Sequence, residues 1–217
     1  MITIQSYCHI WPESLSKGNL RLIDFSSRPA ESSREARLSA VGTSSNTKPS
    51  SHERLVQFYR ALNINYPKFH KMDNLSKLGF LGAEVLFDGG EQTESTSVVF
   101  GNLSSSLESD RVFQESLNDI PSPAQFVYTL PNIVVGEICI RHKIQGENSF
   151  LLTSQFDSQA LIDAIVQSLV FGGADQCLSG WIECINDDFY GFLFLAKYGE
   201  GELELTKSVL DTLYMKK

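Results

Sequence analysis

The sequence of 217 residues is long enough for one domain with a sizeable core, and its hydrophobic content of 42% is ordinary. The formal net charge of −8 argues against a general nucleic-acid binder, because phosphate binding needs a basic face. No apolar run reaches the roughly 20 residues that a membrane-spanning helix needs, so we expect no membrane span.

The cysteines and histidines show no spacing that is typical of a metal site. The cysteines lie in or beside apolar segments, and no secretory leader precedes them. We therefore expect reduced, buried thiols in a cytoplasmic protein, and neither a metal nor a cofactor. These residues are Cys8, Cys139, Cys177, Cys184, His9, His52, His70 and His142.

The first part of the chain predicts a strand, a long polar segment and two helices. Residues 1–12 alternate and are β-branched, which is typical of a strand. Residues 26–52 are rich in Ser, Thr, Arg and Pro and predict a flexible surface excursion. Helical spacing follows in residues 52–64, and Asp73 can cap a second helix. The side chains predicted to face the core are Leu55, Phe58, Tyr59 and Leu62 in the first helix and Leu75, Leu78, Leu81 and Val85 in the second.

In the remainder of the chain, strands and helices alternate. The apolar segment 123–140 predicts one buried helix that Pro131 interrupts. Residues 158–171 predict a helix that is apolar on most faces and therefore buried, with Gly172 as its end. The other predicted elements are strands at 96–102, 148–154, 175–185 and 189–198 and helices at 106–117 and 205–217. This alternation indicates a layered α/β domain.

Four stretches in residues 72–183 resemble the N-terminal half of the β-ketoacyl synthases, in the thiolase-like superfamily. "VVFGNLSSS" is similar to the family's strand and Gly/Ser turn, and "FGGADQCLSGWIE" to its G-x-A-D strand, with Trp181 in place of a glycine. The other two are "MDNLSKLGFLGAEVLF", similar to an early helix, and residues 122–154, which contain the family's spaced Pro123, Phe126, Thr129 and Asn132. The resemblance implies one thiolase-like half over residues 1–217, with a mixed five-stranded sheet and helices on both faces.

The resemblance places a glutamine where the family has its nucleophile. The family's cysteine lies about twenty positions before the aspartate of G-x-A-D, and counting back from Asp175 gives Gln155. A glutamine cannot hold an acyl thioester. Relatives with this exchange are chain-length factors and decarboxylating loading domains, so we expect no catalytic residue here. Phe156 and Asp157 replace small residues of the family's turn and would narrow an acyl tunnel.

A simpler interpretation of the same turn remains open. Gln155 is then a polar residue before a helix, and Asp157 or Ser158 is the N-cap. The two interpretations are compatible, because an inactive site can keep a capping role. The candidate residues of an acyl pocket are Gln155, Phe156, Thr129 and Asn132.

The family's two catalytic histidines belong to a C-terminal half, and no such motif follows Glu183. We therefore expect a non-catalytic, chain-length-factor-like subunit of fatty-acid or polyketide-type biosynthesis. The alternatives are half of a split ketosynthase-type acyltransferase completed by another chain, and a scaffold that binds an acyl carrier. A lone half is expected to leave an apolar face bare.

The expected partners are a full-length ketosynthase, an acyl carrier protein, or both, and a second copy when the chain is alone. Family dimers pair the strand that precedes the nucleophile. Here that strand carries Phe150, Leu151 and Leu152, which are apolar on both faces of the strand and would form an exposed hydrophobic edge.

Overall fold

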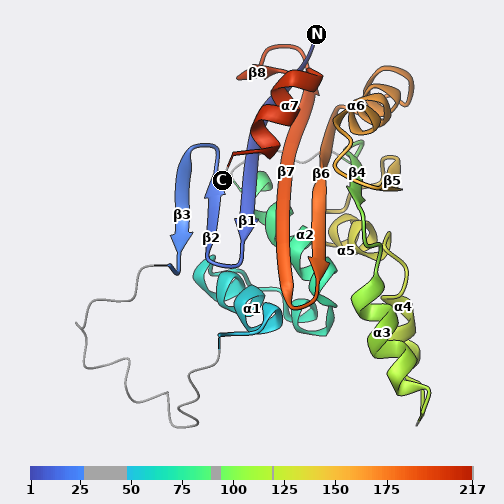
Figure 1. The fold of residues 1–217 in the computed structure, drawn as a ribbon. Coiled ribbons are helices and arrows are strands. Elements are labelled where there is room, and N and C mark those ends of the chain that lie inside the picture. Colours follow the sequence, from blue (N-terminus) through green and yellow to red (C-terminus); the bar gives the residue numbers. More distant parts are fainter. Residues whose placement is uncertain (27–47, 89–93, 119, 217) are drawn as a thin grey trace.

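The computed structural model describes residues 1–26, 48–88, 94–118 and 120–216. Its strands form one mixed sheet in the order β3-β2-β1-β7-β6-β4-β5, and β8 pairs with β1 (Figure 1). The strands are β1 (Ile2–Trp11), β2 (Ser14–Lys17), β3 (Leu20–Asp24), β4 (Ser97–Asn102), β5 (Asn148–Leu152), β6 (Gln176–Ile185), β7 (Asp188–Tyr198) and β8 (Leu203–Glu204).

The five predicted strands are neighbours in this sheet, as β1-β7-β6-β4-β5. The mixed sheet is therefore confirmed, and the short strands β2, β3 and β8 raise its size to eight. β4 runs parallel to both β5 and β6, whereas β7 is antiparallel to β6 and β1. The carboxyl ends of β4, β5 and β6 consequently meet at the same edge of the sheet.

Helices cover both faces of the sheet, as predicted. On one face, the helices α1, α2 and α5 bury the larger apolar cluster; on the other, α6 and α7 bury a smaller one (Figure 1). The helical segments are α1 (Ser51–Ala61), the 3₁₀ turn η2 (Pro67–Lys71), α2 (Asn74–Phe87), α3 (Leu107–Ser116), α4 (Pro123–Val127), α5 (Ile133–His142), α6 (Ser158–Val166), the π-helical turn η3 (Gln167–Phe171) and α7 (Lys207–Tyr214).

Side-chain caps fix the starts of the two helices predicted in the first part of the chain. Ser50 and Glu53 form a reciprocal capping box at α1, and the Asp73 carboxylate accepts from the backbone N–H of Ser76 at α2. All predicted inner residues of both helices are buried or pack on the core. Most of the predicted excursion at 26–52 lies outside the described residues, but its end was placed too late, because Ser51 and His52 already belong to α1.

The prediction of one buried helix at 123–140 is wrong. Pro123 starts the short helix α4, and a turn that contains Pro131 separates it from α5. Proline lacks a backbone N–H and fits only the first turn of a helix, so the chain restarts after Pro131. All of α4 is exposed, and α5 buries one side, with Val134, Val135, Glu137 and Ile138, mainly against α2.

The helix that follows Gln155 is also less buried than its composition predicts. α6 buries Leu161 and Ile165 on the sheet, but Gln159, Asp163 and Gln167 lie exposed on its outer side. The side-chain amide of Gln159 donates to the Asp163 carboxylate at 2.8 Å, as polar residues four apart on a solvated helix do. The outer face of α6 is thus polar, whereas Val170 and Phe171, at the end of the predicted helix, are exposed.

Candidate functional site

A polar turn, residues 102–105, follows β4 at the carboxyl ends of the parallel strands. Hydrogen bonds with Glu183 of β6 and with the Asn102 side chain stabilise it. The Glu183 carboxylate at the end of β6 accepts from the backbone N–H groups of Leu103 and Ser104, at 2.9 and 3.1 Å, and from the Ser104 hydroxyl. The Asn102 side chain accepts from the N–H of Ser105 and donates to its carbonyl. These bonds stabilise the left-handed conformation of Ser105, which has φ +53°.

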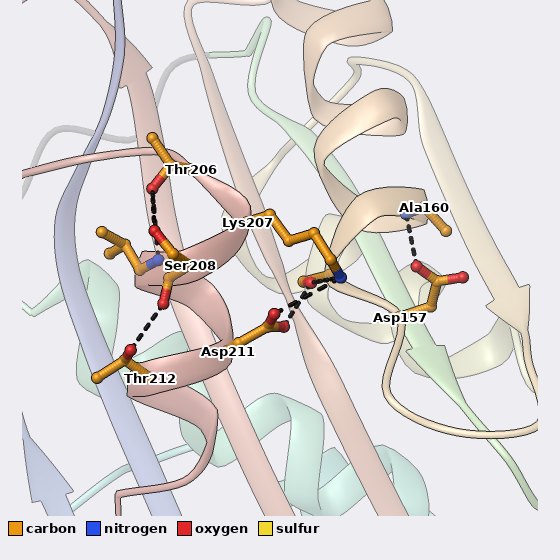
Figure 2. A network of polar contacts seen from close by, with 9 residues as sticks. Asp157, Ala160, Thr206, Lys207, Ser208, Asp211 and Thr212 are labelled. Carbon is orange, nitrogen blue, oxygen red and sulfur yellow. Dashed lines mark hydrogen bonds and ion pairs between the residues drawn. The ribbon is translucent and has the colours of Figure 1, made fainter.

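Gln155 lies beside this turn, between β5 and α6. The N–H of Thr153 donates to the carbonyl of Asn102 at 3.2 Å, and the Thr153 hydroxyl donates to the Gln155 carbonyl at 2.8 Å. Gln155 is exposed. The Asp157 carboxylate accepts from the N–H of Ala160 at 3.0 Å and caps α6 (Figure 2). The capping role proposed for Asp157 is therefore confirmed.

The next residue, Phe156, packs into an aromatic cluster. Its ring stacks on Tyr214 of α7 with centroids 3.8 Å apart and planes 4° from parallel. It meets Trp181 of β6 and Phe192 of β7 edge-on, with centroids 5.8 and 6.2 Å away. Bulky rings therefore fill the space between Gln155 and the sheet.

Polar contacts fasten α7 beside the start of α6. The Ser158 hydroxyl donates to the Asp211 carboxylate at 2.5 Å, and the Lys207 ammonium donates to the Ser158 hydroxyl at 3.1 Å. Lys207 and Asp211 also form an ion pair at 3.5 Å on α7 (Figure 2). The sequence pattern predicts α7 as a helix but not its contact with the Gln155 turn. The apolar spacing of Leu210, Leu213 and Tyr214 was the available signal.

Replacing Tyr214 by alanine tests this aromatic cover. We expect the free energy of unfolding to fall by about 2–4 kcal/mol, because the substitution removes a stacked ring and leaves a cavity against Phe156. Urea denaturation followed by circular dichroism measures the change. Tyr198→Ala is the matched control, since Tyr198 is exposed and should change stability by no more than about 0.5 kcal/mol. Equal effects of both substitutions would contradict the cluster's stabilising role.

The other two pocket candidates, Thr129 and Asn132, lie in the turn between α4 and α5. The Thr129 hydroxyl donates to the carbonyl of Phe126 at 2.7 Å, and the Thr129 carbonyl accepts from the Ser106 hydroxyl. Asn132 precedes α5 without capping it by its side chain. Tyr128, beside Thr129, packs against the α2 and α5 cluster, whereas Phe156 packs against the α6 and α7 cluster. Phe156 and the neighbour of Thr129 thus pack on different faces of the sheet.

The native thiols are poor nucleophiles. All four cysteines are free, and burial raises the pKa of Cys8 and of Cys177 to about 12. Burial, followed by the nearby Glu108 carboxylate, raises the pKa of Cys184 well above its usual value, and burial also raises that of Cys139. These thiols stay protonated at neutral pH.

β5 is an edge strand, and it pairs only with β4 among the strands that the structure describes. Phe150 and Leu151 pack partly on opposite faces of the sheet, whereas the Leu152 side chain is 55% exposed. Further exposed apolar side chains lie on nearby helices and turns, and these are Leu103, Leu107, Leu117, Phe126, Val127, Leu130 and Ile140. The β5 edge and these side chains together are called the β5 surface below.

Within the described ranges, no helix is long and apolar enough to cross a membrane. The same residues contain no group of three or more His, Cys, Asp or Glu side chains that could hold a metal ion.

No family model matches the sequence, and no curated protein matches it. Solved structures do resemble its fold. The chain is similar to the ketosynthase ApeO in complex with its chain length factor ApeC from Xenorhabdus doucetiae, at 18% identity and a TM-score of 0.55, over 70% of this chain and 72% of that one. It is also similar to the ishigamide ketosynthase/chain length factor, at 16% identity and a TM-score of 0.65, over 93% and 63% of the two chains.

A third similar structure is AntDE:AntF, a type II polyketide synthase acyl-carrier protein in complex with its ketosynthase, at 12% identity and a TM-score of 0.58. It is matched over 90% of this chain and 62% of that one, so the chain spans under two thirds of the length of two of these three neighbours. The fold implied by the family resemblance, a thiolase-like α/β arrangement of the ketosynthase type, is confirmed.

Proposed function

We propose that this chain is a non-catalytic, chain-length-factor-like subunit that pairs with a full-length ketosynthase in fatty-acid or polyketide-type biosynthesis. The observation that carries the proposal is Gln155, in the turn between β5 and α6 at the carboxyl ends of the parallel strands. Reacting groups in open α/β sheets gather at that edge. An amide side chain there has no ionisable nucleophile.

The surroundings of Gln155 support the same conclusion. The helix that a nucleophile would use already has the Asp157 carboxylate as its N-cap, which places negative charge where a thiolate or oxyanion would form. Phe156 and Tyr214 occupy the adjacent space with stacked rings. The four native thiols are buried or partly buried with raised pKa values, so none replaces the missing nucleophile.

The split-enzyme alternative agrees less well with these contacts. A second half that covered α6 would bury its polar outer face, including Gln159 and Asp163, and polar groups buried without new partners are costly. It would also meet α7, which is fastened through Lys207, Ser158 and Asp211. A scaffold that binds an acyl carrier remains the second candidate, because in one of the similar structures a carrier protein is bound to a ketosynthase.

The β5 surface is the partner surface in this proposal. A solvent-facing edge strand with exposed apolar neighbours is typical of a protein–protein interface. Burying roughly 1,600 Å² in a standard interface would cover this edge strand and its exposed apolar neighbours. We propose a homodimer for the chain alone and a heterodimer with the ketosynthase in the cell.

Acyl transfer to the isolated chain tests the catalytic part of the proposal. After incubation with acyl-CoA or acylated carrier protein, we expect the intact mass of the chain to stay unchanged, because no activated nucleophile is present. An acyl adduct mapped to residues near Gln155 would overturn the proposal. The double variant Cys177→Ser and Cys184→Ser is the control. A mass increase that persists in this variant cannot come from non-specific acylation of those two thiols.

A further inference from the structure

A cavity of about 600 Å³ lies away from Gln155, between the start of α2 on one side and α3 and α4 on the other. This volume is within the range of small-molecule sites. Its lining includes none of the four pocket candidates predicted from the sequence. Met72 and Leu75 form buried apolar parts of the wall, and Val112 forms an exposed part.

The most unusual group in the lining is Lys77. Its side chain is only 1% exposed, although lysine is almost never fully buried without a counter-charge. The ammonium donates one described hydrogen bond, to the carbonyl of Met72, and lies 5.8 Å from the centre of the Phe69 ring. An ammonium carries three donors, so this cation has capacity for further acceptors. Burial lowers the pKa of Lys77, and the nearby Asp73 carboxylate acts in the opposite direction.

The two carboxylates closest to this end of the cavity are already engaged. The Asp73 oxygens accept from the Ser76 N–H at 3.0 Å and from the Ser109 hydroxyl at 2.8 Å. The Glu108 oxygens accept from the Asp187 N–H at 3.2 Å and from the Cys184 thiol at 3.6 Å. Each oxygen thus already accepts from one protein donor, and neither carboxylate forms an ion pair with Lys77 among the described residues.

The first turn of α3 lines the same cavity without a side-chain cap. Its N-cap hydroxyl, Ser106, instead donates to the carbonyl of Thr129. The positive end of this ten-residue helix therefore adds to the field of the buried ammonium. The rest of the lining carries both signs, with Lys71 and Arg111 against Glu115.

We propose that this cavity binds a small organic carboxylate, with its charged group at Lys77 and the α3 terminus and its apolar body along Met72, Leu75 and Val112. A single negative charge suits the site better than a phosphate dianion, because Asp73 and Glu108 lie close by. The proposal does not depend on the role of Gln155.

Titration of the full chain with sodium octanoate, followed by isothermal calorimetry and ligand-detected NMR, tests the site. We expect saturable binding in the millimolar range or tighter. Octanamide, which has the same length without the charge, is expected to bind at least roughly tenfold more weakly, because a charge-assisted hydrogen bond is lost. Inorganic phosphate is expected not to displace octanoate.

Three variants test where octanoate binds. Lys77→Met removes the ammonium and is expected to weaken octanoate binding at least roughly tenfold, while Lys71→Met, an exposed lysine of the same cavity, changes it less than about twofold. Val112→Trp fills the cavity from its exposed wall and is expected to abolish binding even where Lys77→Met fails to fold. Absence of saturable binding, equal affinity for octanamide, or unchanged binding by Val112→Trp would overturn the proposal.

Discussion

Replacing Leu152 by lysine is expected to convert a dimer of the purified chain into monomer. Leu152 is 55% exposed on the edge strand β5, among the apolar side chains of the β5 surface. An ammonium buried there without a partner costs several kcal/mol, so the dissociation constant should rise on the order of 100-fold or more. Sedimentation equilibrium across micromolar concentrations measures the change.

The opposite edge of the sheet offers a matched control. Leu22 lies on β3, is 41% exposed, and should leave the dimer intact when it is replaced by lysine. Leu151 is less suitable for this test than Leu152, because it packs partly against the cluster under α6 and α7 and its replacement would disturb the fold. A wild-type chain that is monomeric at micromolar concentration, or an intact Leu152→Lys dimer, would contradict the proposed partner surface.

Replacing Gln155 by cysteine is expected to create a reactive thiol without creating a synthase. Gln155 is exposed, whereas the pKa values of Cys8 and Cys177 are about 12. At pH 8 a thiol with a pKa near its ordinary value is partly ionised, and one with a pKa near 12 is not. The new thiol should therefore react with iodoacetamide on the order of 100-fold faster than Cys8 or Cys177, as measured by peptide mass spectrometry.

Condensation needs more than this thiolate. The developing oxyanion and enolate require donors aimed at them, and the Asp157 carboxylate beside the turn adds charge of the wrong sign. We expect no condensation product from Gln155→Cys with acyl and malonyl carrier substrates. Gln155→Ser is the control, since it has a similar small side chain without a thiolate. Product formed by Gln155→Cys alone, without an added protein, would show that the chain contains the machinery that we consider missing.

Local patterns predicted the main framework of the fold. The alternation of residues 1–12 and the apolar runs that became β4 to β7 identified the five contiguous strands, because strand burial is encoded by neighbouring residues. Asp73 was identified as a cap for the same reason, since capping needs only the residues of the first turn. The sequence did not predict the hairpin of β2 and β3, because these strands are only four and five residues long and five of their nine residues are polar.

Tertiary arrangement limited the remaining predictions. Composition alone does not tell which side of α6 faces solvent. The helix is predicted to be buried because most of its residues are apolar, although Gln159, Asp163 and Gln167 are spaced four apart along one side. The stacking of Phe156 on Tyr214 joins residues 58 positions apart, which no local pattern reports. The cavity at Lys77 likewise depends on contacts between α2, α3 and β6.

Native mass spectrometry of the complex purified from the source cells tests the central claim most directly. We expect this chain in a one-to-one complex with a full-length ketosynthase, with the mass of this chain unmodified. Dissociation of that complex by Leu152→Lys, but not by Leu22→Lys, would assign the contact to β5. Recovery of the chain without a ketosynthase would contradict the proposed partner. An acyl group near Gln155 would contradict the proposed non-catalytic role.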